Sequence, residues 1–174
     1  IHKCIESIDS NIPIIVVENS NDQIFKDKLE SKYKNLKCLL SGSNIGMGAG
    51  NNIGIKSAKT DYVFIINPDV ILESNTLEKI FLSSTKLKDF TILSPLNSDI
   101  NIPNYKGKKI NKISYSPFRV DYVDGFSMLL NKKKFHNEDL FDENIFLYLE
   151  NDDLCLRTKK KNEKIYIINN SIID

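Results

Sequence analysis

Short apolar runs alternate with segments of helical spacing over the first half of the chain. Apolar runs predict strands at 13–17, Leu36–Leu40, Tyr62–Ile66 and 90–93, and the run Tyr62–Ile66, made of β-branched and aromatic residues, predicts a strand buried on both faces. Between them, helical spacing predicts a helix over 24–33, one that leaves the glycine-rich stretch 41–55, and one that Asn75 caps with Glu78 three residues later. This alternation predicts an α/β fold, a mostly parallel, Rossmann-like sheet flanked by helices.

The regular alternation stops after Pro95. The stretch 97–116 is rich in Asn, Lys, Ser and Pro, and it is predicted to be a long loop. Two extended segments then surround Asp124-Gly125, a helix begins at Glu150, and a last strand covers 165–168. Four aromatic side chains are expected to close the core in this half of the chain: Phe135, Phe141, Phe146 and Tyr148.

Composition narrows the class of protein. The 174 residues are 41% hydrophobic and 27% charged with a net charge of +1, which fits a single globular domain and argues against a nucleic-acid binder. No apolar run approaches the roughly 20 residues of a membrane span, so only peripheral membrane contact fits the sequence. Three widely spaced cysteines give neither a zinc motif nor a disulfide framework, and they favour a reducing cytoplasm.

Candidate chemistry begins at the end of the third strand. Pro68 cannot donate a ladder hydrogen bond, so it ends the strand and leaves Asp69 at the carboxyl end, where open α/β sheets bind ligands. A carboxylate in this place suits Mg²⁺, which takes one or two protein carboxylates and completes its shell with phosphate oxygens and water. The alternative is a plain turn in which Asp69 bonds its own backbone.

A second strand end and the glycine-rich loop add groups for an anionic ligand. Glu18 and Asp22 follow the first strand and can accept hydrogen bonds from a nucleobase or ribose. The glycines at 46, 48, 50 and 54 would let backbone amides approach a phosphate, or would only pack a helix closely on the sheet. A dinucleotide-binding fingerprint is a remote alternative because it requires glycine where Asn51 stands. The acids of 150–153 offer a general base.

In the order of these motifs the chain resembles the family 2 glycosyltransferases with a GT-A fold, in particular the bacterial rhamnosyltransferase-like branch. Asn67-Pro68-Asp69-Val70 stands where other members carry Asp-x-Asp, and Val123-Asp124-Gly125-Phe126 is similar to their Asp-Gly element. The resemblance covers nearly the whole chain. It extends to the segments 15–20, 44–55 and 141–157.

The resemblance implies an inverting enzyme that moves a sugar from a nucleoside diphosphate, dTDP or UDP, to a hydroxyl of a bacterial surface glycan or lipid-linked acceptor. It implies a cytoplasmic location, with peripheral contact at the inner face of the plasma membrane for a lipid-linked acceptor. Asp69 would hold Mg²⁺ or Mn²⁺, and Asp124 with Gly125 would line the sugar and acceptor pocket. The nucleotide would be bound by Glu18, Asn19, Asp22, Asn44, Gly46, Asn51 and Asn67. The proton would go to one of three acids at the start of the last helix: Glu150, Asp152 or Asp153.

Two residues depart from the family pattern. Glu18 replaces the usual aspartate, and Asn151 stands where the catalytic aspartate belongs, although an amide cannot accept a proton as a base. Either a neighbouring acid acts, or the chain is a catalytically impaired member that binds nucleotide or glycan. Asp153 also has a plainer interpretation, because Arg157 lies one helical turn beyond it and the two can form an ion pair.

A third departure concerns the ends of the chain. Family members place a strand before the first helix, inside the sheet, and often a metal-binding histidine after the last strand. We therefore expect 1–174 to be one glycosyltransferase domain that extends at both ends in the native protein. A continuous sheet without a central gap would contradict this expectation.

Overall fold

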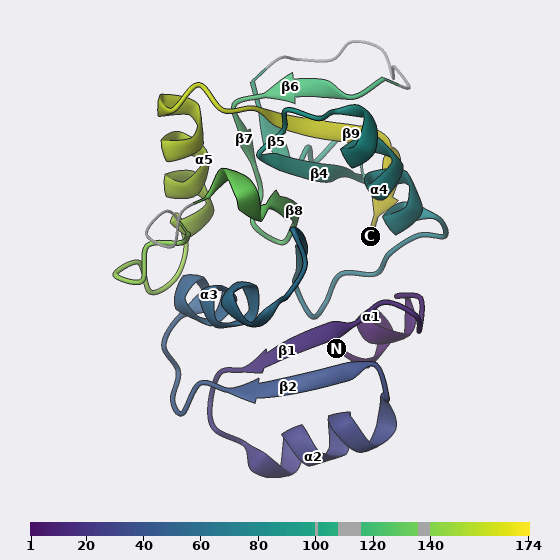
Figure 1. Ribbon diagram of the computed structural model, residues 1–174, viewed down its shortest axis with the longest axis vertical. Coiled ribbons are helices and arrows are strands. Elements are labelled where there is room, and N and C mark those ends of the chain that lie inside the picture. The colour runs from purple at the N-terminus through teal and green to yellow at the C-terminus, as the bar shows by residue number, and fades with distance from the viewer. Residues whose placement is uncertain (100, 108–115, 136–139) are drawn as a thin grey trace.

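A computed structural model describes residues 1–99, 101–107, 116–135 and 140–174 (Figure 1). The first half contains α1 (His2–Glu6), β1 (Ile14–Glu18), α2 (Gln23–Lys32), β2 (Leu36–Leu40), α3 (Met47–Ser57), β3 (Tyr62–Ile66) and α4 (Thr76–Lys86). The second half contains β4 (Ile92–Asn97), β5 (Tyr105–Lys106), β6 (Phe118–Val120), β7 (Tyr122–Val123), β8 (Ser127–Asn131), η1 (Lys132–Lys134), α5 (Glu150–Lys160) and β9 (Ile165–Ile173). The first three predicted strands are confirmed to within one residue.

Apart from the short antiparallel pair β5–β7, the described strands form a mixed sheet in two parts. β1 and β2 pair in parallel, and a five-stranded sheet has the order β3-β8-β4-β9-β6. β4 and β9 are parallel, whereas β8 runs antiparallel between β3 and β4. Helices α2 and α3 pack on the β1–β2 pair, and α4 packs on β4 and β9. The fold is therefore the predicted α/β arrangement, with β8 inserted against the direction of its neighbours.

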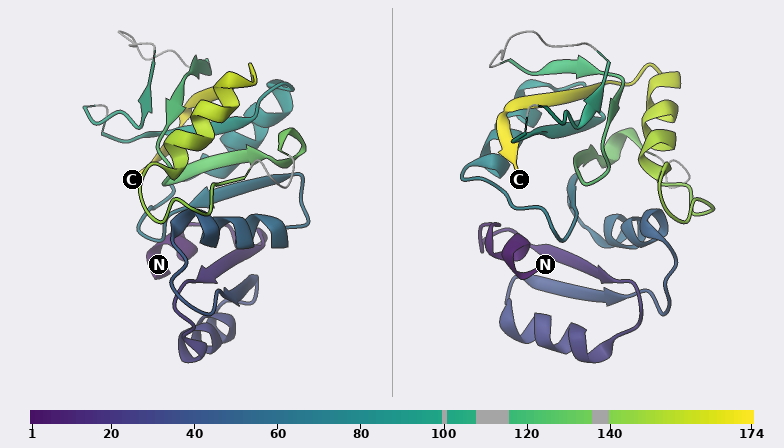
Figure 2. Two further views of the ribbon diagram at one scale, coloured as in Figure 1. Left: turned by 90° about the vertical axis from the view of Figure 1, so that its left-hand side faces the viewer. Right: turned by 180° about the vertical axis from the view of Figure 1, so that it is seen from behind.

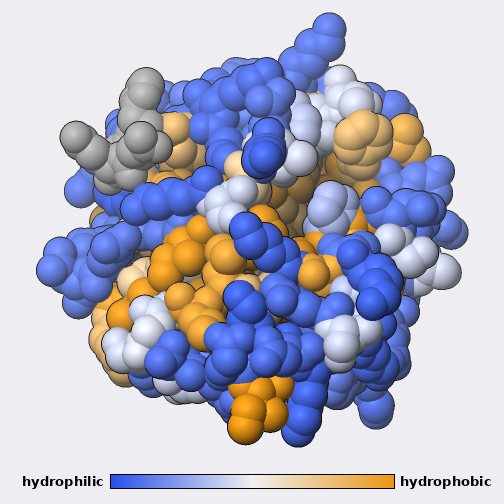
Figure 3. Space-filling model, turned by 60° about the horizontal axis from the view of Figure 1, so that its bottom comes forward, coloured by the Kyte–Doolittle hydropathy of each residue, from blue (hydrophilic) through white to orange (hydrophobic). Residues whose placement is uncertain are grey.

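The predicted break in the sheet lies between β1 and β3. No hydrogen-bonded ladder joins these two strands in the described part of the chain, and each pairs with one neighbour only. Figure 2 shows the β1–β2 pair with α2 at one end of the molecule and the five-stranded sheet at the other. Every residue of β1 is only half-buried although four of the five are apolar. Apolar side chains also gather in a band across the face of the molecule shown in Figure 3.

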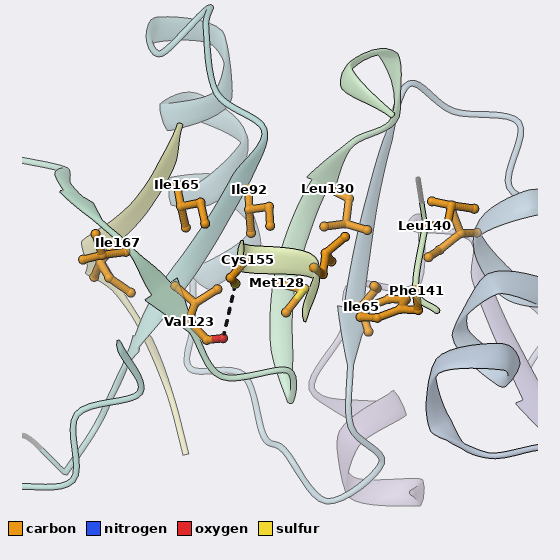
Figure 4. Close-up of a cluster of buried hydrophobic side chains, with 13 residues drawn as sticks. Ile65, Ile92, Val123, Met128, Leu130, Leu140, Phe141, Cys155, Ile165 and Ile167 are labelled. Carbon is orange, nitrogen blue, oxygen red and sulfur yellow. Dashed lines mark hydrogen bonds between the residues drawn. The ribbon is translucent and has the colours of Figure 1, made fainter. Parts of the chain in front are cut away.

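The largest hydrophobic cluster joins the five-stranded sheet to α3 and α5 (Figure 4). Ile92 and Leu130 come from the central strands, Ile55 comes from α3, and Cys155 comes from α5. The Cys155 thiol lies 3.9 Å from the carbonyl oxygen of Val123. Burial raises the pKa of this thiol to about 11, so Cys155 is a core residue rather than a nucleophile.

Two expectations about local structure are wrong. Phe141 is buried, but Phe146 and Tyr148 are 55% and 75% exposed instead of closing the core. Tyr148 and Leu149 both have positive φ, at 61° and 69°, so the chain turns outward just before α5. Asn75 also has a left-handed backbone and makes no side-chain cap, because a capping side chain reaches the helix amides from an extended conformation.

The membrane prediction is consistent with the helices. Within the described ranges, no helix is both long enough and apolar enough to cross a bilayer. The predicted loop 97–116 is described only in part, because residues 100 and 108–115 lie outside the described ranges.

Candidate functional site

The pairing of β3 with β8 brings two predicted motifs to one edge of the sheet. The register places Ile66 opposite Ser127, and beyond it the Asn67 amide donates to the carbonyl of Phe126 at 2.9 Å. The strands are antiparallel, so the residues that follow Ile66 lie beside the residues that precede Ser127. Asp69 and Asp124-Gly125 therefore belong to the same edge.

Asp69 lies in the turn that ends β3. The Val70 amide donates to the Asn67 carbonyl at 3.2 Å, and the Cys4 thiol also points to that carbonyl at 3.5 Å. Pro68 occupies the second position of this turn, which its fixed φ favours. The turn is thus present, but the Asp69 side chain makes no hydrogen bond or ion pair with any described residue. Its exposed carboxylate is free to meet a ligand.

A chain of hydrogen bonds links the Asp-Gly element to α5. The Tyr122 hydroxyl donates to Asp124 Oδ1 at 2.9 Å, and Asn151 Nδ2 donates to the Tyr122 oxygen at 2.7 Å and to the Val123 carbonyl at 3.2 Å. A Cβ on Gly125 would lie 3.1 Å from the Asn151 Cβ, so these elements are in close contact. Burial, and then the Asp124 carboxylate, raise the pKa of Tyr122, which keeps the phenol protonated as a donor.

The three acids of α5 have different surroundings. Glu150 is 3% exposed, and its Oε2 has no hydrogen-bond partner among the described residues. Asp153 Oδ2 forms an ion pair with Arg157 Nε at 2.7 Å, which confirms the plainer interpretation of Asp153. Asp152 is partly exposed, 3.7 Å from the ammonium of Lys106. Asp152 is therefore the acid of α5 that remains open to solvent beside the site.

Tyr122 and Lys106 are site residues that sequence reasoning missed. The Lys106 ammonium lies 4.1 Å from the centre of the Tyr122 ring, in a cation–π contact, while it also faces Asp152. β5 and β7 pair Lys106 with Tyr122, which explains the contact. The sequence showed Lys106 only as the start of a basic run, and no local signal pairs it with a tyrosine sixteen positions on.

The glycine-rich loop meets the segment before α5. The Met47 amide donates to the Phe146 carbonyl at 3.0 Å, and a Cβ on Gly46 would lie 2.3 Å from that oxygen. A Cβ on Gly48 would lie 3.1 Å from the Phe141 Cβ. These two glycines thus allow α3 to pack against the segment before α5 rather than against the sheet, whereas a Cβ on Gly54 would lie 3.3 Å from the Val17 side chain of β1. The first turn of α3 is largely buried, at Gly46, Gly48 and Ala49, and Gly46 begins the helix without a side-chain cap.

The nucleotide-binding candidates surround the end of β1. Glu18 accepts hydrogen bonds from the Ser20 hydroxyl and, at 2.7 Å, from the Asp22 amide, and these bonds lower its pKa, the Ser20 bond most. The Asp22 carboxylate caps α2 by accepting from Phe25 at 2.9 Å. Asn19 donates to Asn44 Oδ1 and to the Gly46 carbonyl. These side chains therefore hold the loops around the strand end in place.

Two asparagines of α3 differ in their contacts. Asn51 carries a buried Nδ2 that has no partner among the described residues. Asn52, which sequence reasoning missed, is 2% exposed and exchanges hydrogen bonds with the backbone of Phe141, at 2.8 and 3.1 Å. The side chain of Asn67 makes no bond with a described residue. Asn67 thus carries an uncommitted amide, and the amide nitrogen of Asn51 is unpaired among the described residues but buried.

The side chains of the candidate site can be compared with the ligands that a divalent cation requires. No three His, Cys, Asp or Glu side chains gather into a metal-binding set within the described ranges. Mg²⁺ needs only one or two protein carboxylates when a diphosphate and water supply the remaining oxygens. A single free carboxylate at a strand end, Asp69, fits that requirement.

The fold is that of the GT-A glycosyltransferases: the structure of GalNAc-T7 with UDP, GalNAc and Mn²⁺ matches 99% of this chain and 39% of its own, with a TM-score of 0.79 and 15% identity. S. aureus TarS 1–349 in complex with UDP matches 99% of this chain and 55% of its own, with a TM-score of 0.68 and 17% identity.

The sequence pattern of Glycosyl transferase family 2 matches residues 1–143, so the chain belongs to that family and is a glycosyltransferase. Two named relatives agree with this membership. Rhamnosyltransferase WbbL of Escherichia coli (strain K12) is 28% identical, over 88% of this chain and 69% of its own length. The low-salt glycan biosynthesis hexosyltransferase Agl10 of Haloferax volcanii is 24% identical, over 87% of this chain and 54% of its own length. The chain therefore spans about half to two-thirds of the length of these relatives.

Proposed function

We propose that this chain transfers a sugar, with inversion, from a dTDP- or UDP-sugar to a hydroxyl of a bacterial surface glycan or lipid-linked acceptor. The observation that carries the proposal is the meeting of Asp69 and Asp124 at one sheet edge, with the start of α5 hydrogen-bonded to that edge. The names of the relatives support rhamnosyl or hexosyl transfer. The same proposal places the protein in the cytoplasm, in peripheral contact with the membrane that holds a lipid-linked acceptor.

Asp69 would hold Mg²⁺ or Mn²⁺ on the donor diphosphate. When bound, such an ion neutralises charge on the leaving nucleoside diphosphate. The carboxylate suits this role because it is exposed and engages no described partner. The structure of GalNAc-T7 with Mn²⁺ supports a divalent ion for this fold.

The nucleoside would lie at the end of β1. Glu18 and Asp22 supply carboxylate oxygens there, and Asn19 with Asn44 fixes the loop that leads to Gly46. The side-chain amides of Asn51 and Asn67, which have no described partner, would donate hydrogen bonds to oxygens of the nucleotide sugar. Asp124 and Gly125 would line the sugar and acceptor pocket, and a carboxylate among Glu150, Asp152, Asp153 and Asp124 would take the acceptor proton.

Substitution Asp69→Ala tests the metal role. Thermal unfolding of the wild type should shift upward with UDP or dTDP only when Mn²⁺ is present, and the variant should lose that shift together with nucleotide release from UDP-glucose or dTDP-rhamnose. Asp9→Asn, at an exposed aspartate of the loop before β1, is the control and should keep both. An unchanged metal-dependent shift in Asp69→Ala would contradict the assignment.

A second candidate is a catalytically impaired member that binds nucleotide or glycan, which the amide at Asn151 favours. Such a protein would show the metal-dependent thermal shift without releasing nucleotide from any donor. A shift with NAD but not with UDP or dTDP would instead favour the dinucleotide binder.

We also propose that the domain is completed by a strand between β1 and β3. Neither strand has a ladder partner on the facing edge within the described ranges, and unpaired edges of apolar strands attract further strands.

A further inference from the structure

The position usually given to the catalytic base has a different chemistry in this chain. Asn151 is 8% exposed, and its Nδ2 donates to both the Tyr122 oxygen and the Val123 carbonyl. An amide nitrogen has two hydrogens, so both are used. The side chain is therefore a fixed donor, and it joins α5 to the Asp-Gly element instead of accepting a proton.

The hydrogen bonds lead from Asn151 to a carboxylate. The Tyr122 oxygen accepts a hydrogen bond from Asn151 Nδ2 at 2.7 Å, and the Tyr122 hydroxyl donates a hydrogen bond to Asp124 Oδ1 at 2.9 Å. The Asp124 amide donates to the Asn104 carbonyl at 2.9 Å, which fixes the backbone. The second oxygen, Oδ2, has no partner among the described residues, and the residue is half-buried. Asp124 is thus an oriented carboxylate with one free oxygen.

We propose that Asp124 has taken over the role of catalytic base from position 151, with Tyr122 as its positioning residue. This inference rests on the proposed function and deepens it. In the step, the acceptor hydroxyl gives its proton to Asp124 Oδ2 while its oxygen forms a bond to the anomeric carbon. The bond from that carbon to the diphosphate oxygen breaks, and the electron pair leaves with the nucleoside diphosphate.

The acids of α5 are less suited to this role. Asp153 is held by Arg157 at 2.7 Å, and Glu150 is buried beside α3, where a Cβ on Gly48 would contact it at 3.5 Å. Asp152 is the remaining competitor. It faces the Lys106 ammonium, and no bond ties it to Asn151 or to the Asp-Gly element in the described ranges.

The local chemistry also explains why an amide fits at position 151. A phenol has one hydrogen, and Tyr122 gives it to Asp124. A second carboxylate at 151 would face the same oxygen without a hydrogen to accept, and it would leave the Val123 carbonyl without the amide donor. An amide donor at position 151 therefore suits a carboxylate base at position 124.

Moving the carboxylate back provides the test. With Mn²⁺ and either UDP-glucose or dTDP-rhamnose, release of nucleoside diphosphate to water is measured for the wild type and its variants. General-base catalysis contributes about 10²–10⁴-fold, so Asp124→Asn should lower kcat by at least about 100-fold with little change in KM. The double variant Asp124→Asn, Asn151→Asp should recover at least about tenfold of that loss. Tyr122→Phe should lower kcat by about tenfold at nearly constant KM, because Asp124 then lacks its hydrogen-bond donor.

Asp121→Asn is the matched control, since it removes only an exposed ion pair with Lys159 three residues from Asp124, and its kcat should equal that of the wild type. Asp152→Asn is the competing arm: a loss as large as that of Asp124→Asn, with no recovery in the double variant, would overturn the assignment. Turnover unchanged in Asp124→Asn would overturn it as well, while the proposed function would stand. No release by the wild type and the double variant, despite metal-dependent nucleotide binding, would contradict both.

Discussion

At the scale of single residues, the site depends on two glycines at positions where a Cβ would come too close to another segment of the chain. Gly46 closes the amide end of α3 directly under the Phe146 carbonyl, and Gly125 lies against Asn151. Each glycine thus joins two parts of the site that are far apart in the sequence. The aromatic segment before α5 can approach the glycine-rich loop only because Gly46 has no Cβ.

Gly46→Ala should therefore be more destabilising than an ordinary glycine substitution. Gly46 and Gly42 share a φ of +88°, but a Cβ on Gly42 would meet nothing within 4 Å, whereas one on Gly46 would lie 2.3 Å from Phe146 O. Gly42→Ala measures the strain of a positive φ without a steric contact, about 1–2 kcal/mol. The ψ of 169° at Gly46 adds to the strain there, because that region is open essentially to glycine alone. Gly46→Ala should cost at least about 2 kcal/mol more, because the backbone around 146 has to shift. Urea unfolding of both variants measures the difference, and equal losses would show that the contact is absent in solution.

At the scale of elements, α3 is the connection between the two parts of the molecule. It packs on β1, and through Asn52 it holds the segment that leads to α5. Asn52 Nδ2 also donates to Glu143 Oε1 at 3.0 Å. The position of α5, and with it the distance between Asn151 and Gly125, depends on this buried amide.

Asn52→Ala should lower the free energy of unfolding by about 2–4 kcal/mol, because the amide and carbonyl of Phe141 would remain buried or half-buried without partners. Lys56→Ala, which removes only an exposed 3.4 Å pair with the same Glu143, should change it by less than about 0.5 kcal/mol. Chemical denaturation followed by circular dichroism compares the two variants. A similar small effect of both would contradict the role of Asn52.

Elements were easier to predict than their contacts. Apolar runs located β1, β2 and β3, but the burial on both faces that such runs predict is wrong for two of them. β1 is half-buried throughout, and in β3 only Ile65 is fully buried. The same patterns did not reveal that β8 runs antiparallel beside β3, although that pairing brings Asp124 to the edge that holds Asp69. The contact between Lys106 and Tyr122 depends on the short β5–β7 ribbon, which periodicity in one segment cannot show. Apolar character also gave the wrong result for Phe146 and Tyr148, because it does not indicate on which side of a turn a residue lies.

At the scale of the whole molecule, the candidate site follows a continuous series of contacts. Asn19 holds Gly46, Met47 binds the Phe146 carbonyl, and Asn151 at the start of α5 binds Tyr122 beside Asp124. The series runs around the break between β1 and β3 rather than across it. In the part of the chain that the structure describes, α3 and α5 therefore connect the two parts of the sheet at the site, and strand pairing does not.

Hydrogen exchange should detect this break directly. β4 lies between β8 and β9, and β9 lies between β4 and β6, so both have neighbours on two sides. Among the described residues, β1 and β3 each have one neighbour, and amides that face the break have no ladder acceptor. In native-state exchange of residues 1–174 followed by NMR, about half of the amides of β1 and β3 should exchange much faster than those of β4 and β9, because unpaired amides need no opening. Uniform protection of β1 and β3 at the level of β4 would show that another strand, from this chain or a second copy, occupies the break in solution.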